Sequence, residues 1–256
     1  MNKSAIYKEY GIEYKAGKIL APEFGWINPL LINGNAKIGK TVYHFSTLPG
    51  KKEYKATWDG KEYRVYGTCA DDCAGCYGMT GNYRYQSTID SLAVKTVLAR
   101  DNLEFVRAAI MAQIKADGIE TIRIHATGDF FSRDYLGMWV DVIKENPAVT
   151  FWTYTKEYSA QAAFDSLDNA NIVKSNVLDI GYNFGHCDYI IAVYKLLKDM
   201  GKPVYICKCG IDKNQHCAGC KGCSDNEYVL FLEHSTGYKA EKDSLYSELK
   251  AIVENQ

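Results

Sequence analysis

Residues 121–132 read TIRIHATGDFFS, and this stretch decides how the rest of the chain is interpreted. Its first residues alternate between β-branched and polar side chains, which favours a strand, and Gly128-Asp129 provides a turn where that strand ends. A helical pattern follows from Asp134 to Lys144, with apolar residues recurring on one side. These apolar residues are Tyr135, Met138, Trp139, Val142 and Ile143. The stretch therefore predicts a strand, a glycine turn and a helix, which is the repeating unit of α/β folds.

The same alternation extends in both directions from this unit. Upstream, Ile89 to Ala116 is helical in pattern, as two helices that meet near Asp101, a candidate N-cap, and Asp117-Gly118 ends the run. The predicted downstream segments are strand VTFWTY, helix SAQAAFDSL, strand NIVKSNV, helix Asp188 to Met200, strands PVYIC and YVLFLEH, and a last helix from about Ala240. Strands that alternate with helices argue for a parallel sheet built from right-handed crossovers.

Six such strands form either an open sheet or a partial barrel, and in both cases active residues gather at the carboxyl ends of the strands. We expect an α/β fold, a partial (β/α)6 TIM-like barrel with a cysteine-rich C-terminal segment. The expected parts are residues 1–206, with N-terminal strands, the barrel and a metal-cluster loop, and residues 207–256, with a second metal site, a strand and a helix. We expect them to form a single compact unit.

The bulk composition excludes several classes of protein. The chain has 256 residues, a formal net charge of −1 and 47% hydrophobic residues, as ordinary globular proteins do. This charge gives no global reason to bind duplex nucleic acid, although a local basic groove is left open. The N-terminus has no apolar signal region and no run of eighteen apolar residues occurs, so we expect a cytoplasmic protein with no membrane partner.

Cysteine placement gives the main chemical signal, because all but Cys187 of the nine cysteines fall in two clusters. Clustered cysteines in a reducing compartment are typical of metal sites. CADDCAGC supplies Cys69, Cys73 and Cys76, and the hairpin-like stretch WDGKEYRVY runs directly into it, so we expect the loop at the carboxyl end of a strand. Three cysteines can bind three irons of a [4Fe–4S] cluster and leave the fourth iron open. A zinc site completed by Cys187, His186 or the second cluster is the alternative.

The second cluster, CKCGIDKNQHCAGCKGC, lies between the predicted strands PVYIC and YVLFLEH. Its cysteines are Cys207, Cys209, Cys217, Cys220 and Cys223. The last three, at C-x2-C-x2-C, resemble a ferredoxin-type run, and either of the first two closes a four-iron site. A zinc knuckle uses similar spacing, with His216 as a possible extra ligand. The sequence therefore predicts a second [4Fe–4S] cluster or a zinc ion here.

One motif is rejected. GNAKIGKT, residues 34–41, matches the P-loop pattern, whose mechanism needs a helix to start at the lysine because the phosphates bind at the helix N-terminus. The residues that follow, VYHFSTLPG, alternate and are β-branched or aromatic, so they predict a strand. We interpret this segment as a glycine-rich turn before a strand.

The C-x3-C-x2-C loop in an α/β chain resembles the radical S-adenosylmethionine enzymes, whose open iron is chelated by that cofactor. Those enzymes carry a Gly-Gly-Glu-like segment after their second strand, and the next strand here ends in Thr127-Gly128-Asp129. The resemblance implies that this turn holds the methionyl end of the cofactor. The alternative is a plain turn in which Asp129 caps the next helix. The usual aromatic residue before the third cysteine is Gly75 here, which makes Tyr77 the candidate for contact with adenine.

A closer likeness covers most of the chain. The segments NAKIGKTVYHFSTLPG, CYG and RIHATGDFFSRDYLGMWVDVIKENPAVTFWTYTK, with the cysteine-rich tail, are similar to the phage and mobile-element family called gene product 88. This resemblance implies an architecture but no substrate. Arg123, His125, Tyr154 and Lys156 bring polar groups to strand ends, and we treat them as candidate catalytic residues for the cofactor carboxylate or a substrate. Arg123 and His125 alternate along a strand and are expected to share a face, a core histidine being the alternative.

The resemblance implies a radical S-adenosylmethionine enzyme that generates a 5'-deoxyadenosyl radical and abstracts hydrogen from an unknown substrate. A reductant such as flavodoxin or ferredoxin would be its electron-donating partner. The rival interpretation is a non-catalytic zinc or iron–sulfur protein of a phage or mobile element that binds nucleic acid or a host protein. The 20 tyrosines and the basic character of the second cysteine cluster favour this rival.

Overall fold

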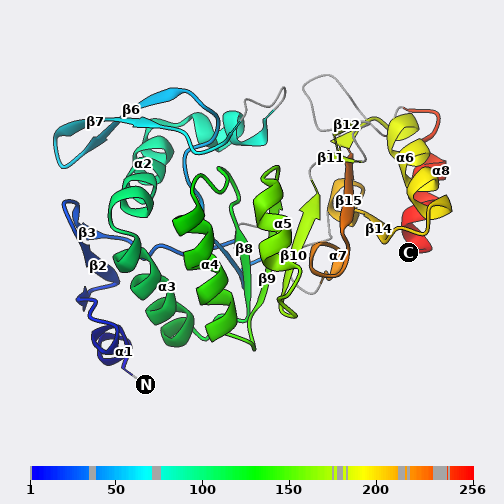
Figure 1. Ribbon diagram of the computed structural model, residues 1–256. Coiled ribbons are helices and arrows are strands. Elements are labelled where there is room, and N and C mark those ends of the chain that lie inside the picture. The colour runs from blue at the N-terminus through cyan, green and yellow to red at the C-terminus, as the bar shows by residue number, and fades with distance from the viewer. Residues whose placement is uncertain are drawn as a thin grey trace.

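The computed structural model describes residues 2–34, 39–70, 76–174, 176–177, 181–182, 184–212, 217, 220–232, 241 and 243–256. At its centre is a five-stranded sheet in the order β10-β9-β8-β5-β4 (Figure 1). The strands span Ile32–Asn33 (β4), Val42–His44 (β5), Thr121–Ile124 (β8), Thr150–Thr155 (β9) and Ala170–Lys174 (β10). β4 runs antiparallel to β5, whereas β5, β8, β9 and β10 are parallel. The predicted run of parallel strands joined by helices is therefore present in this part of the chain.

The two faces of this sheet carry different side chains. Ile122, Ile124 and Phe151 are fully buried in a large core, and we call their side of the sheet the helix face. Arg123 pairs in register with Trp152, so both lie on the opposite side. Tyr154 is the next residue of β9 on that side, and C-terminal cysteines pack beside it. We therefore call that side the cysteine face.

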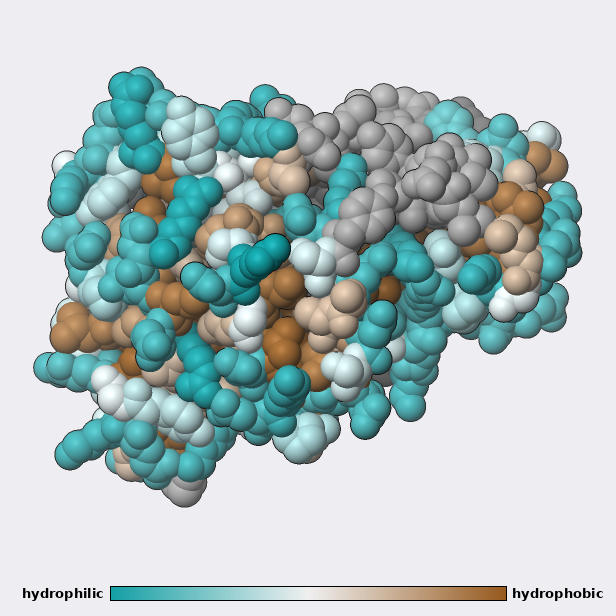
Figure 2. Space-filling model, in the orientation of Figure 1, coloured by the Kyte–Doolittle hydropathy of each residue, from teal (hydrophilic) through white to brown (hydrophobic). Residues whose placement is uncertain are grey.

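Four helices cover the helix face (Figure 1). They span Gln86–Asp101 (α2), Leu103–Asp117 (α3), Arg133–Glu145 (α4) and Tyr158–Phe164 (α5). Asn102 separates the first two helices, so Asp101 is the last residue of α2 and not the N-cap of α3. Gly118 ends α3 in the left-handed conformation, with φ of 60°, as the Asp-Gly signal predicts. Their outer surface mixes hydrophilic and hydrophobic residues, as Figure 2 shows, which is typical of amphipathic helices.

The N-terminal residues add a small layer outside α3. Helix α1 (Lys3–Glu9) and a three-stranded antiparallel sheet make up this layer. The strands of this sheet are Tyr14–Lys15 (β1), Lys18–Ala21 (β2) and Gly25–Ile27 (β3). Tyr7 and Ile19 are almost fully buried in the same core as the sheet residues. The layer therefore extends the main core and forms no separate unit.

The strand that leads to Cys69 is not part of the parallel sheet. It is β7 (Lys61–Tyr66), which pairs with β6 (Glu53–Trp58) in a two-stranded hairpin. Asp59 and Gly60 both have positive φ, as the tight turn requires. The backbone N–H of Thr68 donates to Leu48 O at 2.8 Å, so the chain returns beside the end of β5. The cysteine loop thus lies at the carboxyl end of a parallel strand, but that strand is β5.

The C-terminal part has a second core. The elements of this part are Asn176–Val177 (β11), Gly181–Tyr182 (β12), Phe184–Gly185 (β13), Cys187–Asp199 (α6), Val204–Ile206 (β14), a 3-10 turn at Lys208–Gly210, Gly222–Asp225 (α7), Tyr228–Leu232 (β15) and Tyr246–Glu254 (α8). Two further 3-10 turns, Tyr77–Met79 and Gly81–Arg84, lie earlier in the chain, between β7 and α2. β13, β15 and β14 form a parallel sheet in that order. Cys187 is fully buried in this core beside Ile190. The strands of the described ranges close no barrel, and the predicted partial barrel and the boundary at residue 206 stay predictions.

The structure bears on the P-loop and on membrane-spanning helices, both of which the sequence argues against. After Lys40 and Thr41 the chain enters strand β5, so the helix that a P-loop requires is absent at that point, and residues 35–38 of the motif lie outside the described residues. The rejection of a P-loop is confirmed. No described helix has both the length and the apolar character needed to cross a bilayer.

Gly128 holds the tightest contact at the carboxyl edge of the sheet. Its φ is 84°, a conformation that side chains rarely adopt. A Cβ built on it would overlap Thr47 Oγ1 and lie 2.7 Å from Thr68 Oγ1. Glycine is therefore required because two threonines of the chain itself occupy the space.

We expect Gly128→Ala to lower the free energy of unfolding by about 2–4 kcal/mol, because it combines a strained φ with overpacking. Urea unfolding followed by circular dichroism measures this change. Gly137 in α4 is the matched control, because a Cβ there meets nothing within 4 Å, and Gly137→Ala should stabilise the protein by up to about 1 kcal/mol. Equal effects of the two substitutions would contradict the assignment.

Candidate functional site

The cysteine loop starts from an anchored threonine at the carboxyl edge of the sheet. Thr68 Oγ1 donates to Leu48 O at 3.1 Å and accepts from the backbone N–H of Asp129 at 3.0 Å. It also lies 2.9 Å from Thr47 Oγ1. One hydroxyl therefore connects the end of β5, the turn after β8 and the residue before Cys69.

The far end of the loop returns to the same turn. A Cβ on Gly78 would lie 2.9 Å from Thr127 Cγ2 and 3.0 Å from Pro49 Cβ, so this glycine packs directly against the Thr127–Asp129 turn. Cys76 lies two residues earlier, and both Cys69 and Cys76 are partly buried. Cys73 and Gly75 lie outside the described residues, as does the side chain of Tyr77. The described ends of the predicted cluster loop thus meet at the predicted cofactor turn.

Asp129 is buried, and its carboxylate accepts three hydrogen bonds from the protein. Thr155 Oγ1 and the N–H of Phe130 donate to Oδ1 at 2.6 and 2.8 Å, and the N–H of Lys156 donates to Oδ2 at 3.2 Å. Burial raises the pKa of Asp129 to about 6, although these donors favour the ionised form. A carboxylate has about four acceptor positions, so Oδ2 keeps one for another donor.

Neither sequence interpretation of this turn describes all of it. The cap of α4 is Ser132, whose hydroxyl accepts from the N–H of Tyr135, so the alternative in which Asp129 caps the helix is wrong. The radical-enzyme resemblance implies a turn that holds a cofactor, but the atoms that approach Gly128 belong to Thr47 and Thr68. The turn therefore serves mainly to pack the end of β8 against the segments that follow β5 and β7.

His125 does not share a face with Arg123, so that prediction is wrong. β8 ends at Ile124, and His125 has φ of 60°, which breaks the alternation of a strand. Its Nε2 lies 2.8 Å from Tyr135 Oη, and its ring packs edge-on against Phe130. Burial lowers the pKa of His125 to about 3, so the ring is neutral. The alternative of a core histidine describes this residue.

Arg123 and Tyr154 lie together on the cysteine face. The Arg123 guanidinium is 4.9 Å from the centre of the Tyr154 ring, and Tyr154 Oη is 2.8 Å from Cys223 Sγ. Arg123 Nε is buried without a hydrogen-bond partner in the described part of the chain. A partly buried guanidinium in this position favours a negative charge nearby. Lys156 contributes its backbone N–H to Asp129, as described above.

The C-terminal cysteines gather beside this pair. Cys207, Cys209 and Cys223 pack with Val173 and Tyr154 in one small cluster. Cys209 hydrogen-bonds with both Cys207 and Cys217, and Tyr205 Oη lies 3.7 Å from Cys220 Sγ. Asn171 Nδ2 donates to Cys223 O at 2.8 Å and thereby attaches α7 to β10. The structure therefore brings the five predicted cysteines into one neighbourhood.

The donor chemistry of this neighbourhood suits a soft metal. Within the described ranges, no group of three or more His, Cys, Asp or Glu side chains is placed closely enough to hold a metal ion, and His216 lies outside them. Burial raises the pKa of the Cys223 thiol to about 12. Such a thiol loses its proton near neutral pH only when a metal binds it. The cysteines fit metal binding by their chemistry.

Sequence reasoning missed the polar residues that support both sets of cysteines. Thr47, Thr68 and Thr155 fix the turn at Asp129, and Asn171 fixes α7. Thr68 had a usable signal, because it directly precedes Cys69. The other three have no motif, since their roles come from strand pairing across distant parts of the chain.

Comparison with known proteins agrees with the gene product 88 resemblance. The gene 88 protein of Mycobacterium phage L5 is 33% identical over 129 residues, which covers 43% of this chain and 53% of that protein. The match thus spans about half the length of that curated relative. No solved structure matches the chain. The model of the family described as Gene product 88 matches residues 29–244, which include the parallel strands and both cysteine clusters, and the chain therefore belongs to this family.

Proposed function

We propose that this protein is an iron–sulfur enzyme of the radical S-adenosylmethionine type, with Cys69, Cys73 and Cys76 as the ligands of a [4Fe–4S] cluster. The observation that carries the proposal is the meeting of both ends of the cysteine loop at the Thr127–Asp129 turn. In the proposal, β5, β8, β9 and β10 are the first strands of a partial (β/α)6 barrel. Ligands of parallel α/β sheets bind at this carboxyl edge, which supports the placement.

The chain's own residues would bind and orient the cofactor. Asp129 Oδ2 has one acceptor position left for the methionyl ammonium, and the donors on Oδ1 hold the carboxylate in one orientation. The carboxylate must be ionised for this role, and its pKa of about 6 permits that at neutral pH. When bound, cluster and cofactor would supply one-electron cleavage and hydrogen abstraction from a substrate, with electrons from a flavodoxin or ferredoxin.

The C-terminal cysteines would hold a second centre. Arg123 would offset the negative charge of metal-bound thiolates, and Tyr154 Oη would donate to the sulfur of Cys223. Its cysteines pack at the cysteine face, where Asn171 attaches α7 to β10, and this position suits a structural or electron-transfer role. The same observation favours the second candidate function, a non-catalytic zinc or iron–sulfur scaffold that binds nucleic acid or a host protein.

Anaerobic purification with measurement of iron, sulfide and zinc separates the two functions. We expect at least about four irons per chain, and formation of 5'-deoxyadenosine when S-adenosylmethionine and dithionite are added. Cys76→Ala should abolish that formation and remove about four irons, because it takes a ligand from the cluster.

Cys187→Ala is the matched control, since Cys187 is a core residue, and it should keep the cleavage. Zinc as the sole bound metal, without any cleavage, would exclude the enzyme and leave the scaffold.

The raised pKa of Asp129 predicts how stability changes with pH. The folded pKa of about 6 exceeds the ordinary value of 3.8, so the folded protein binds this proton more tightly than the unfolded chain does. The contribution of Asp129 to stability therefore falls as pH rises from about 4 to about 6, by an amount on the order of 3 kcal/mol.

Asp129→Asn does not titrate, so its free energy of unfolding relative to the wild type should increase across this pH range. Urea unfolding of metal-free protein at several pH values measures the difference. Parallel pH profiles for the two proteins would show that Asp129 does not titrate as expected.

A further inference from the structure

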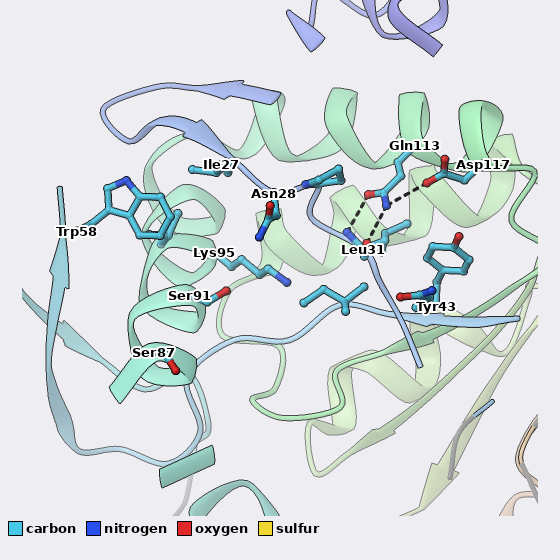
Figure 3. A pocket seen from close by; sticks show the side chains of 14 residues that line it. Ile27, Asn28, Leu31, Tyr43, Trp58, Ser87, Ser91, Lys95, Gln113 and Asp117 are labelled. Atoms are coloured by element: carbon cyan, nitrogen blue, oxygen red, sulfur yellow. Dashed lines mark hydrogen bonds between the residues drawn. The ribbon is translucent and has the colours of Figure 1, made fainter. Parts of the chain in front are cut away.

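A cavity of about 520 Å³, with no cysteine among the residues that line it, lies between α2, α3 and the segment that leads from β3 to β4 (Figure 3). Its size is typical of small-molecule sites. Ile27, Leu31 and Val94 provide apolar walls, and Trp58 of the β6–β7 hairpin stands at one end. The cavity is therefore built from the N-terminal half of the chain.

Lys95 extends from α2 into this cavity, as Figure 3 shows. The residue is only 4% exposed, and no described residue hydrogen-bonds to its Nζ. Its Nζ lies 5.9 Å from the centre of the Phe45 ring, at the outer limit of a cation–π contact. A buried ammonium without a partner is unfavourable, so this side chain needs either a negative ligand or loss of its proton.

The charged groups nearby do not neutralise Lys95. Asp117 is the one acidic residue that lines the cavity in the described part of the chain, and it pairs with Lys3 at 2.5 Å and accepts from Gln113. From β5, Tyr43 has a raised pKa and His44 has a pKa lowered to about 4, so both are neutral near pH 7. The segment Ile27–Asn33 and Trp58 bring no ionisable group.

Two hydroxyls extend the polar strip that Lys95 begins. Ser87, Ser91 and Lys95 follow one another at intervals of four residues along α2, so they share one side of the helix. All three line the cavity. A polar strip beside apolar walls suits a ligand with one acid group and an apolar body.

We propose that this cavity binds a small organic anion, whose acid group is held by Lys95 Nζ and whose apolar body lies against Ile27, Leu31 and Val94. An anion compensates the charge of the buried Lys95 ammonium, to which no described residue hydrogen-bonds. A neutral ligand would leave that charge uncompensated. The site needs no metal, so its test succeeds or fails independently of the cysteine clusters.

Binding should also take up protons. Burial lowers the pKa of Lys95 to about 7, so the free amine is mostly neutral at pH 8. An anion favours the charged form, and each ligand bound at pH 8 should therefore bring about one proton onto the protein. Tyr43, whose pKa is raised, and His44, whose pKa is lowered to about 4, do not take up this proton near pH 8.

Isothermal titration calorimetry with benzoate and its neutral analogue benzamide tests the proposal. We expect saturable benzoate binding to the wild type and at least tenfold weaker binding of benzamide. Titrations at pH 8 in two buffers with different ionisation enthalpies should reveal the proton uptake. This part of the experiment uses the unmodified protein and does not depend on a variant that folds.

Lys95→Met should weaken benzoate binding at least tenfold, because it keeps the apolar stem and removes the charge. Lys144→Met, at an exposed lysine of α4, is the matched control and should bind benzoate as the wild type does. Any one of four results would overturn the proposal: no saturable benzoate binding at millimolar concentration, equal affinity for benzoate and benzamide, equal affinity in Lys95→Met, or binding without proton uptake.

Discussion

The carboxyl edge of the sheet depends on the hydroxyl of Thr68. It bonds to Leu48 after β5 and to Asp129 after β8, and the absence of a side chain at Gly128 is what allows the two threonines to approach. Parallel strands need crossovers, so no tight turn joins the carboxyl ends of β5 and β8, and contacts such as these hold the loops that follow them together. These hydrogen bonds of Thr68 fix the position of Cys69, because the cysteine directly follows Thr68 in the chain.

The two faces of the sheet show why the site has two distinct chemical environments. On the helix face, apolar side chains exclude water, and even His125 is held neutral between Phe130 and Tyr135. On the cysteine face, Arg123 and Tyr154 bring a charge and a hydroxyl toward sulfur. A one-residue change of register in β8 would exchange these environments, so the apolar alternation of this strand also determines where polar chemistry is available.

The sequence predicted elements whose apolar period is strong and local. α4 and β8 were found within a few residues, because Trp139 and Ile122 belong to regular patterns. β5 was not recognised as a central strand, because it has only three residues and pairs with β8 far along the chain. The alternating side chains of β7 indicate a strand, but they do not indicate which strand it pairs with. Its partner is β6, in a two-stranded sheet.

The sequence predicted the order of the candidate site residues along the chain, but not the contacts between them. Cys69 and Asp129 could be associated because each follows a predicted strand, whereas the hydrogen bond through Thr68 depends on three-dimensional packing. His125 was misplaced because its φ of 60° ends the strand pattern, and nothing in the sequence marks that break. Lys95 gave no signal, since a lysine within a helix is ordinarily exposed.

The β6–β7 hairpin leaves the fold and re-enters it at almost the same point, since Gly67 N–H donates to Lys52 O and Thr68 N–H to Leu48 O. Such a lateral insertion can be lengthened or shortened without displacing the chain on either side of it. Changes in hairpin length would therefore leave Cys69 where it is, but would move Trp58 and reshape one end of the Lys95 cavity. The fold thus allows the cavity to diversify while the cysteine loop stays fixed.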